Sequence, residues 1–275
     1  VKHLLIFFLL LSSSLIKVCD NSIMSVFILI DMGAIIVPLT TDTESEHEYF
    51  FESALVDVVI TGDSITRRKH SRKCHIIETL KGKNHAGLVL FSTGTTGPPQ
   101  AILHDLTLFL KRFETPRPTY RTLSFLLFDH VGGLNTLFHT LFNKGVVVAP
   151  TSRTVDSILT DCEKYKVEVL PATPTFLRLM LMSGAVPDKI SSHLKIISYG
   201  TEALDQSTLS ELCKLLPRID FRQTFGVSEL GVIRAKSESR NSLFMKLGGE
   251  GVEVRVIDDI LQIRLLVYLI NFFVV

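Results

Sequence analysis

The 275-residue sequence has few cysteines and no closely spaced pair of them. Cys19, Cys74, Cys162 and Cys213 lie far apart and form no C-x-x-C motif. Zinc sites and disulfide scaffolds need closer spacing, so both are disfavoured, and a reducing compartment is indicated. We therefore expect a cytoplasmic protein. The net charge of +1 gives no field that would select nucleic acid or an anionic membrane as a partner.

Long hydrophobic runs are also lacking. The apolar stretches at residues 4–11 and 265–275 are too short to span a bilayer, so no stable membrane span is expected. Residues 1–19 resemble a signal peptide or a short anchor, and the C-terminal stretch has the composition of an unfinished core strand or a membrane tail. Because the chain begins with Val1, we expect a fragment that is incomplete at both ends.

A basic run, TRRKHSRKCH at residues 66–75, is the one stretch that suggests nucleic-acid binding. It has no interleaved aromatic residues, and its charge is balanced elsewhere in the chain. We interpret it as a solvated loop between two strands and expect no nucleic-acid partner.

Predicted strands and helices alternate along most of the chain. Strands are expected at 57–63, 87–93, 122–128, 146–150, 167–170, 194–200 and 220–226, and at 35–37, where Pro38 would stop the strand. Helices are expected up to Gly33 and at 131–145, 154–166, 173–184 and 205–216, with Asp205 as an N-cap. Alternation of this kind predicts an α/β fold of mostly parallel sheets covered by helices.

The pattern changes near residue 244, where alternating residues and turn signals predict antiparallel strands. We therefore expect an α/β domain at 20–240 and the start of a truncated β subdomain at 241–275.

A glycine- and threonine-rich loop, FSTGTTGPPQAILHD at residues 91–105, follows a buried strand. Glycines let backbone N–H groups approach an anion closely, and hydroxyl groups add further donors, so the loop is suited to holding phosphates. It is no Walker A loop, because the G-x-x-x-x-G-K-[ST] pattern is absent. An ordinary turn remains the alternative. The candidate phosphate-binding residues are Ser92, Thr93, Gly94, Thr95, Thr96, Gly97 and Gln100.

This loop resembles the signature loop of the adenylate-forming superfamily, which includes acyl-CoA synthetases, luciferases and peptide-synthetase adenylation domains. Four further segments follow in the family's order: LLFDHVGG at 126–133, SYGTEAL at 198–204, QTFGVSELG at 223–231 and KLGGEGVEVRVID at 246–258. The chain is similar above all to acyl-CoA-synthetase-like ligases. The resemblance implies the layered αβαβα large domain of these enzymes.

The resemblance also implies a two-step reaction with ATP and Mg²⁺. A carboxylic acid is first converted to acyl-AMP with release of pyrophosphate, and the acyl group is then transferred to a thiol of CoA or of a carrier protein.

Residue roles follow from the same resemblance. The 92–97 loop would hold the β- and γ-phosphates, and Glu229 would bind Mg²⁺. His130 would lie near the acyl carboxylate. Adenine and α-phosphate contacts would come from Gly200, Thr201, Glu202, Phe225, Gly226 and Ser228.

Several of these residues have simpler interpretations. Phe225 by itself could be a core aromatic residue, Glu229 a surface acid and His130 part of a turn. His104, four residues after Gln100, would cap the next helix or touch phosphate, and the cap is the preferred interpretation.

The sequence departs from the family in two respects. Gln100 stands where the signature loop usually ends in lysine, and no TGD-type motif or small C-terminal domain follows. The expected activity of this chain alone is therefore weak or absent, and a degenerate nucleotide-binding remnant without catalysis is the alternative.

Overall fold

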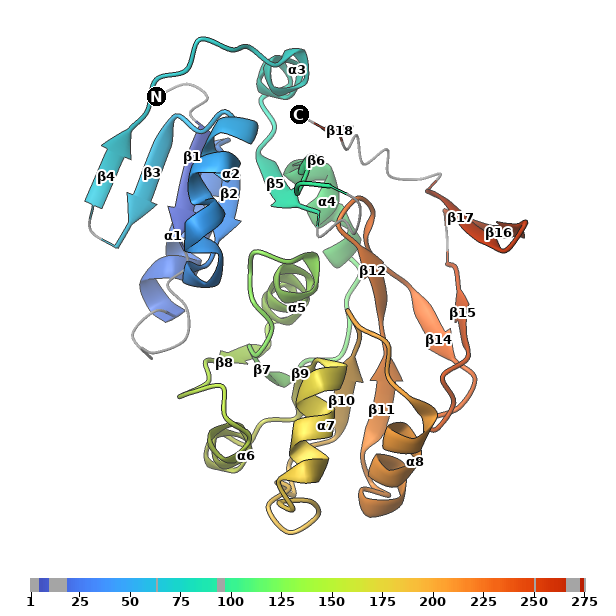
Figure 1. The fold of residues 1–275 in the computed structure, drawn as a ribbon. Helices are drawn as coiled ribbons and strands as arrows, with labels where there is room; N and C mark the ends of the chain where they lie inside the picture. Colours follow the sequence, from blue (N-terminus) through green and yellow to red (C-terminus); the bar gives the residue numbers. More distant parts are fainter. Residues whose placement is uncertain are drawn as a thin grey trace.

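Two β-sheets form the frame of the molecule (Figure 1). The computed structural model describes residues 5–9, 19–62, 64–92, 97–249, 251–265 and 273–274. The first sheet has the strand order β18-β6-β5-β2-β1-β3-β4. Its strands are β1 (Leu5–Leu9), β2 (Ile35–Leu39), β3 (Val58–Thr61), β4 (Ser64–Arg67), β5 (Gly87–Phe91), β6 (Ala101–Asp105) and β18 (Phe273–Val274).

The first sheet is mixed. Strands β1, β2, β3 and β5 run parallel, whereas β4, β6 and β18 pair antiparallel with their neighbours. The apolar N-terminal stretch thus contributes β1, which lies between β2 and β3. The C-terminal stretch contributes β18, which pairs with β6 through Phe273 and Val274.

The second sheet is parallel throughout its described pairings, in the order β11-β10-β9-β7-β8. Its strands are β7 (Arg121–Leu123), β8 (Val146–Val148), β9 (Val169–Ala172), β10 (Ile196–Tyr199) and β11 (Asp220–Gln223). The predicted α/β fold is confirmed. Because carboxyl ends of parallel strands meet at one edge, this sheet presents its strand-end loops together, the usual location of ligand sites in open α/β sheets.

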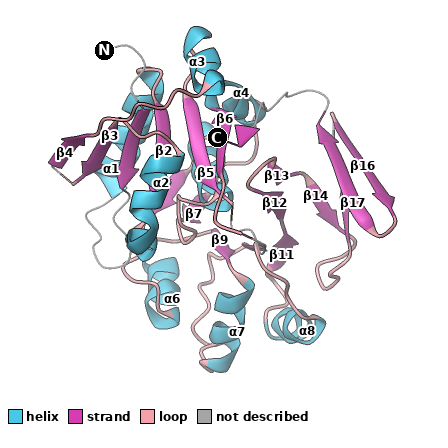
Figure 2. Cartoon of the chain, turned by 45° about the horizontal axis from the view of Figure 1, so that its top comes forward, coloured by secondary structure: helices cyan, strands magenta, loops and turns pink. Residues whose placement is uncertain are grey.

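Helices cover the sheets. The chain forms α1 (Cys19–Asp31), α2 (His47–Ser53), α3 (His75–Gly82), α4 (Leu106–Leu110), α5 (Val131–Phe142), α6 (Val155–Lys164), α7 (Pro174–Met182) and α8 (Gln206–Leu215), with short 3-10 helices η2 (Thr41–Glu46) and η3 (Lys111–Phe113). In Figure 2, α2 lies in front of the first sheet, and α6, α7 and α8 lie along the second.

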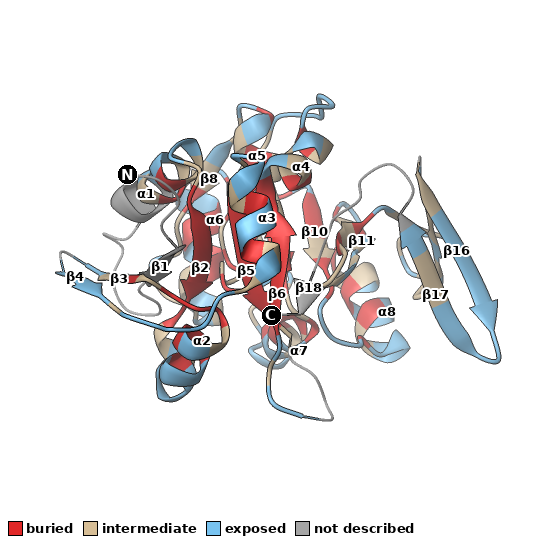
Figure 3. Ribbon diagram, turned by 90° about the horizontal axis from the view of Figure 1, so that it is seen from above, coloured by how far each residue is buried: buried red, intermediate tan, exposed pale blue. Residues whose placement is uncertain are grey.

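Three apolar cores hold these layers together. Helices α2 and α3 pack on one face of the first sheet, and α1, α4 and α5 pack on its other face. Helices α6, α7 and α8 pack on the second sheet. Figure 3 shows the central strands β2, β5 and β6 as buried. Helix α5 contributes to the core beside the first sheet and also contacts β8 of the second, so it joins the two sheets.

Three small antiparallel pairs follow the second sheet. They are β12 (Phe225–Val227) with β13 (Gly231–Ile233), β14 (Ala235–Ser237) with β15 (Met245–Leu247), and β16 (Val252–Ile257) with β17 (Ile260–Leu265). Figure 3 shows the β16–β17 hairpin standing apart from the layered part, with mostly exposed residues. Antiparallel strands were expected after residue 244. The division into two domains stays a prediction.

Several sequence predictions differ from the structure. Pro38 does not stop its strand: β2 runs to Leu39, and its pairing with β5 involves only Ile35 and Ile36, so no donor is required from Pro38 on that side. The predicted strand at 122–128 is limited to Arg121–Leu123. The basic run does not connect two strands, because it leads from β4 into α3, which begins at His75.

In the part of the chain that the structure describes, no helix is long and apolar enough to cross a membrane.

Candidate active site

The candidate phosphate loop connects two buried antiparallel strands, β5 and β6. Its described ends are tied together: the backbone N–H of Ser92 donates to the carbonyl oxygen of Gln100 at 3.0 Å, and the N–H of Gln100 donates to Ser92 Oγ at 3.0 Å. Gly97 and Gln100 are exposed. The central residues Thr93, Gly94, Thr95 and Thr96 lie outside the described residues. The hairpin therefore fixes where the loop starts and ends.

The candidate adenine segment follows β10 at the carboxyl edge of the second sheet. Gly200 is buried, and a Cβ atom there would lie 2.3 Å from Thr224 Oγ1 and 2.6 Å from the Thr224 carbonyl oxygen. This close approach requires glycine at position 200. It places the segment against Thr224, the residue directly before β12. Thr201 has a φ of +74°, an uncommon conformation for a residue with a side chain.

The Glu202 side chain is used within the protein. Its Oε2 atom accepts hydrogen bonds from Thr175 Oγ1 at 2.6 Å and from the Thr175 backbone N–H at 3.2 Å, near the N-terminus of α7. These bonds hold the 200–202 segment against α7. The Glu202 carboxylate is thus engaged within the protein, which leaves its backbone as the group predicted to contact a nucleotide.

The β12–β13 hairpin carries the remaining predicted nucleotide and metal residues. Phe225 opens β12 and is half-buried, and Ser228 and Glu229 form the turn before β13. Glu229 is half-buried and has no hydrogen bond or ion pair with any other residue that the structure describes. Its carboxylate is thus available to a ligand.

A pocket brings the adenine segment and the β12–β13 hairpin together with the first turn of α5. Its lining includes Gly200, Thr201 and Gly226 of the predicted site, with Gly132 and Asn135 from α5. Its volume is about 60 Å³, far below the roughly 300–1,000 Å³ of a typical ligand pocket. The pocket can receive only one part of a larger molecule.

His130 lies at the N-cap position of α5, directly before the pocket-lining Val131. Its side chain is 50% exposed, and Nε2 lies 3.7 Å from Asp129 Oδ1. Asp129 is buried, and its Oδ2 accepts a hydrogen bond from Thr40 Oγ1 at 2.9 Å. Thr40, directly after β2, therefore holds Asp129 beside the exposed imidazole of His130. Asp129 and Thr40 were not among the predicted site residues, and the tripeptide FDH at 128–130 is the sequence signal that lies nearest to them.

His104 joins the phosphate hairpin to the Ser228–Glu229 turn. It lies on β6, is fully buried, and places Nε2 2.7 Å from the backbone oxygen of Ser228. The predicted helix cap is wrong, because Asp105 caps α4: its Oδ1 accepts from the Leu108 N–H at 3.1 Å. The His104 ring is bonded to Ser228 instead, and the cap falls to Asp105, the last residue of β6.

Burial sets the protonation of His104. Loss of solvent lowers its pKa from the ordinary 6.5 to about 4; the hydrogen bond to Ser228 opposes this shift, and the positive charge of Arg112 adds to it. A carbonyl oxygen can only accept, so Nε2 carries the proton. The imidazole is therefore neutral near pH 7, with Nε2–H as its donor.

We expect this lowered pKa to make stability depend on pH. Below pH 6.5 the unfolded chain protonates His104 while the folded chain does not, so stability falls as the pH drops from 6.5 toward 4. The loss should reach about 1.4 kcal/mol per pH unit. Urea unfolding of the wild type and His104→Gln between pH 7.5 and 4.5 measures it. The wild type should lose stability relative to the variant as the pH falls, and a pH-independent difference would contradict this account.

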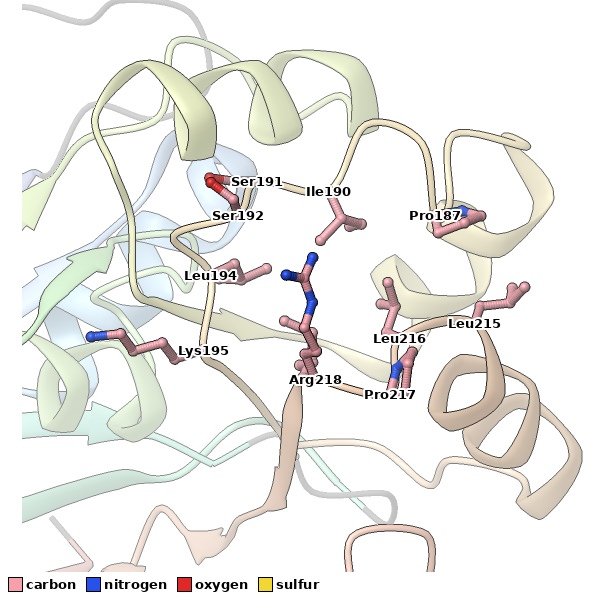
Figure 4. A pocket seen from close by; sticks show the side chains of 11 residues that line it. Pro187, Ile190, Ser191, Ser192, Leu194, Lys195, Leu215, Leu216, Pro217 and Arg218 are labelled. Carbon is pink, nitrogen blue, oxygen red and sulfur yellow. The ribbon is translucent and has the colours of Figure 1, made fainter.

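A second, larger pocket lies away from these motifs. Its volume is about 340 Å³, and it lies between the connections that enter β10 and β11 at their amino ends. Figure 4 shows Arg218 extending toward Ile190 from the α8–β11 connection. The predicted nucleotide residues follow the carboxyl ends of the same strands, so this pocket belongs to the opposite edge of the sheet.

Comparisons with known proteins agree with the motif order. The family model for "AMP-binding enzyme" matches residues 19–262. Acyl-CoA synthetase 7 of Caenorhabditis elegans is 24% identical over 164 residues, which cover 54% of this chain and 30% of that protein. The chain thus spans less than a third of this curated relative.

Solved structures share the fold at low sequence identity. The N-terminal subdomain of Klebsiella oxytoca NpsA, solved in complex with anthranilyl-AMSN, has a TM-score of 0.75 at 14% identity, covering 97% of this chain and 76% of that one. E. coli MenE with bound OSB-AMS has a TM-score of 0.67 at 14% identity, covering 96% and 59%. With a family model that matches most of its length and the fold of adenylate-forming N-terminal domains, the chain belongs to the AMP-binding enzymes.

Proposed function

We propose that this chain carries the nucleotide-binding part of a ligase that activates a carboxylic acid with Mg-ATP. A carboxylate oxygen attacks the α-phosphorus, the bond from that phosphorus to the α,β-bridging oxygen breaks, and pyrophosphate leaves with the electron pair. The product is acyl-AMP. In the whole protein, a thiol such as that of CoA or of a carrier protein then attacks the acyl carbon, and AMP leaves.

One observation supports this proposal above the others. The phosphate hairpin of the first sheet and the Ser228–Glu229 turn beside the second are joined by the bond from His104 to Ser228, 124 residues apart. The Gly200 segment meets the same β12 strand through Thr224. These two contacts support a single site in which groups suited to the phosphates, the metal and adenine would act together.

Each group has a role that follows from its chemistry. The Ser92–Gly97 loop would hold the β- and γ-phosphates through backbone N–H groups and hydroxyls as negative charge develops on the leaving pyrophosphate. The Ser228 hydroxyl would donate to the α-phosphate. Phe225 would pack on adenine, with Gly226 allowing close approach, and the backbone of Gly200, Thr201 and Glu202 would contact its edge. His130 would face the acyl carboxylate.

The residues at the site fit Mg²⁺. The described residues contain no cluster of three or more acidic, histidine or cysteine side chains that could form a protein cage. Mg²⁺ is commonly held by one or two carboxylates together with substrate phosphates and water, and Glu229 supplies such a carboxylate. When bound, the ion would neutralise charge on the phosphates during the transfer.

Pyrophosphate exchange tests the proposal. We expect a carboxylate-dependent exchange of labelled pyrophosphate into ATP with at least one acid of a broad panel in a protein extended to the length of its relatives, and weak or no exchange in this chain alone. A folded, extended protein that shows no exchange with any acid would contradict the proposal.

The substitution Gln100→Lys tests whether the chain is a ligase or a nucleotide-binding remnant without catalysis. If the loop still holds phosphate, Gln100→Lys adds one charge-assisted hydrogen bond, about 1.5–3 kcal/mol, and should tighten ATP binding roughly ten- to a hundredfold. Calorimetry measures the change, with Gln206→Lys, at the exposed first position of α8, as a control for added charge. Equal affinity of Gln100→Lys and this control would favour the remnant.

A further inference from the structure

His104 lies between two segments to which the proposed function gives different roles. One is the loop for the terminal phosphates, and the other is the Ser228–Glu229 turn for the α-phosphate and the metal. His104 follows the phosphate loop by four residues on β6, opposite Leu88 of β5. Its ring lies edge-on to Phe109 of α4 at 5.9 Å between centroids. Since the ring is fully buried between these elements, its position is set by the packing of β6 and α4.

The bond accepted by Ser228 acts on the peptide group between Ser228 and Glu229. A carbonyl oxygen held at 2.7 Å from Nε2 fixes the plane of that peptide, and with it the point from which each of the two side chains projects. The polar contact of His104 is with this backbone oxygen and with neither of the two side chains. The histidine therefore acts on the turn through its backbone.

A second contact supports the same hairpin from the same side. Arg112 of η3 donates from Nη1 to the Val232 carbonyl oxygen at 3.4 Å. Its Cζ lies over the Phe109 ring, 4.2 Å from the ring centroid. Gly231 lies so close that a Cβ atom there would be 2.6 Å from Arg112 Nη1. The β6–α4–η3 segment thus clamps the β12–β13 hairpin at both ends of its turn.

Building on the proposed function, we propose that His104 is a positioning residue that holds the Ser228–Glu229 turn against the β5–β6 hairpin, from which the proposed phosphate loop extends. The nitrogen Nδ1 has no hydrogen-bond partner among the described residues, so Nε2 alone makes the polar contact. A buried donor that reaches one backbone carbonyl links β6, which follows the proposed phosphate loop, to the turn that carries the proposed metal carboxylate.

Two substitutions of similar length separate this role from packing. Glutamine places an N–H near the position of Nε2, whereas methionine fills the space without a donor. For His104→Met we expect backbone hydrogen exchange of 225–233 to rise about tenfold without ligand, with no change in α8, and Mg-ATP to bind about tenfold more weakly, as for the loss of one hydrogen bond. His104→Gln should restore both properties to near the wild-type values.

The same variants in a Ser228→Ala/Glu229→Gln background provide the decisive comparison. Because the proposed role acts through these two side chains, His104→Met should weaken nucleotide binding less than about twofold once both are removed. Two results would overturn the positioning role alone, provided that the wild type binds Mg-ATP. One is an equal loss of nucleotide affinity in both backgrounds, and the other is equal affinity and hydrogen exchange in the Met and Gln variants. A folded wild type that binds no Mg-ATP would overturn the proposed function as well.

Discussion

Replacing Glu229 with glutamine is expected to remove the magnesium-dependent part of ATP binding. The carboxylate is half-buried at the turn and has no partner among the described residues, so the substitution removes one ligand charge and changes little else. Loss of groups that only orient metal ligands costs about 10–100-fold, and loss of a direct ligand should cost at least about a hundredfold.

Calorimetric titration of ATP with and without Mg²⁺ measures this effect. Binding of ATP in the presence of a chelator should be nearly the same for the wild type and Glu229→Gln. Glu211→Gln, an exposed acid on α8, controls for the change in net charge. Equal Mg-ATP affinity in the wild type and Glu229→Gln would show that the metal is held elsewhere.

Replacing Gly133 with alanine is expected to destabilise the fold strongly. A Cβ atom at Gly133 would lie 1.9 Å from the Leu127 carbonyl oxygen and 2.6 Å from its carbonyl carbon. Backbone atoms cannot move away without shifting α5, so we expect a loss of at least about 3 kcal/mol. In a chain of this size that corresponds to a Tm lower by about 6–12 °C.

The neighbouring glycine provides a matched control. A Cβ atom at Gly132 would meet only the Leu126 side chain at 3.6 Å and Thr201 at 3.8 Å, which are ordinary contacts. Alanine in a helix is also favoured over glycine by roughly 0.5–1 kcal/mol. Gly132→Ala should therefore keep or slightly raise the Tm in thermal unfolding. Equal Tm values for the two variants would show that α5 does not approach residues 126–127 this closely.

The helices around the second sheet could be predicted because their end signals are local. Asp205 caps α8 as expected, and Thr154 caps α6 in the same way: each side chain accepts a hydrogen bond from the backbone N–H three residues later. The apolar face of α8 then follows from residue spacing alone. Caps and periodicity are short-range properties, so one sequence is enough to locate them.

Elements that depend on distant contacts could not be predicted. The stretch 220–226 has the pattern of one strand, yet it breaks at Thr224, whose backbone N–H donates to the Tyr199 carbonyl oxygen at 2.7 Å. The chain leaves the parallel sheet there, and Phe225 pairs with Ile233 in a new hairpin. Likewise β6, AILHD, is buried at every position, so it shows neither helix nor strand periodicity.

The candidate site, like the fold, has features that could be predicted from local sequence and features that depend on distant contacts. The motifs could be located from the sequence because each is contiguous, and the order of five of them indicated the family. Their meeting through His104 and Ser228 could not be predicted, since nothing in the sequence links positions 124 residues apart. The signal available was a histidine inside an apolar strand, which required either a partner or exposure.

Calorimetric titration with non-hydrolysable acyl-AMP analogues tests the central claim most directly, with circular dichroism to establish that the sample is folded. The claim is that the adenine segment, the β12–β13 hairpin and the phosphate hairpin form one site for an activated acid. We predict saturable binding of at least one analogue from a panel of aliphatic and aromatic acyl groups, with ATP competing for the same site. A folded chain that binds neither the analogues nor Mg-ATP would contradict the claim and would leave a signature loop that no longer serves a nucleotide.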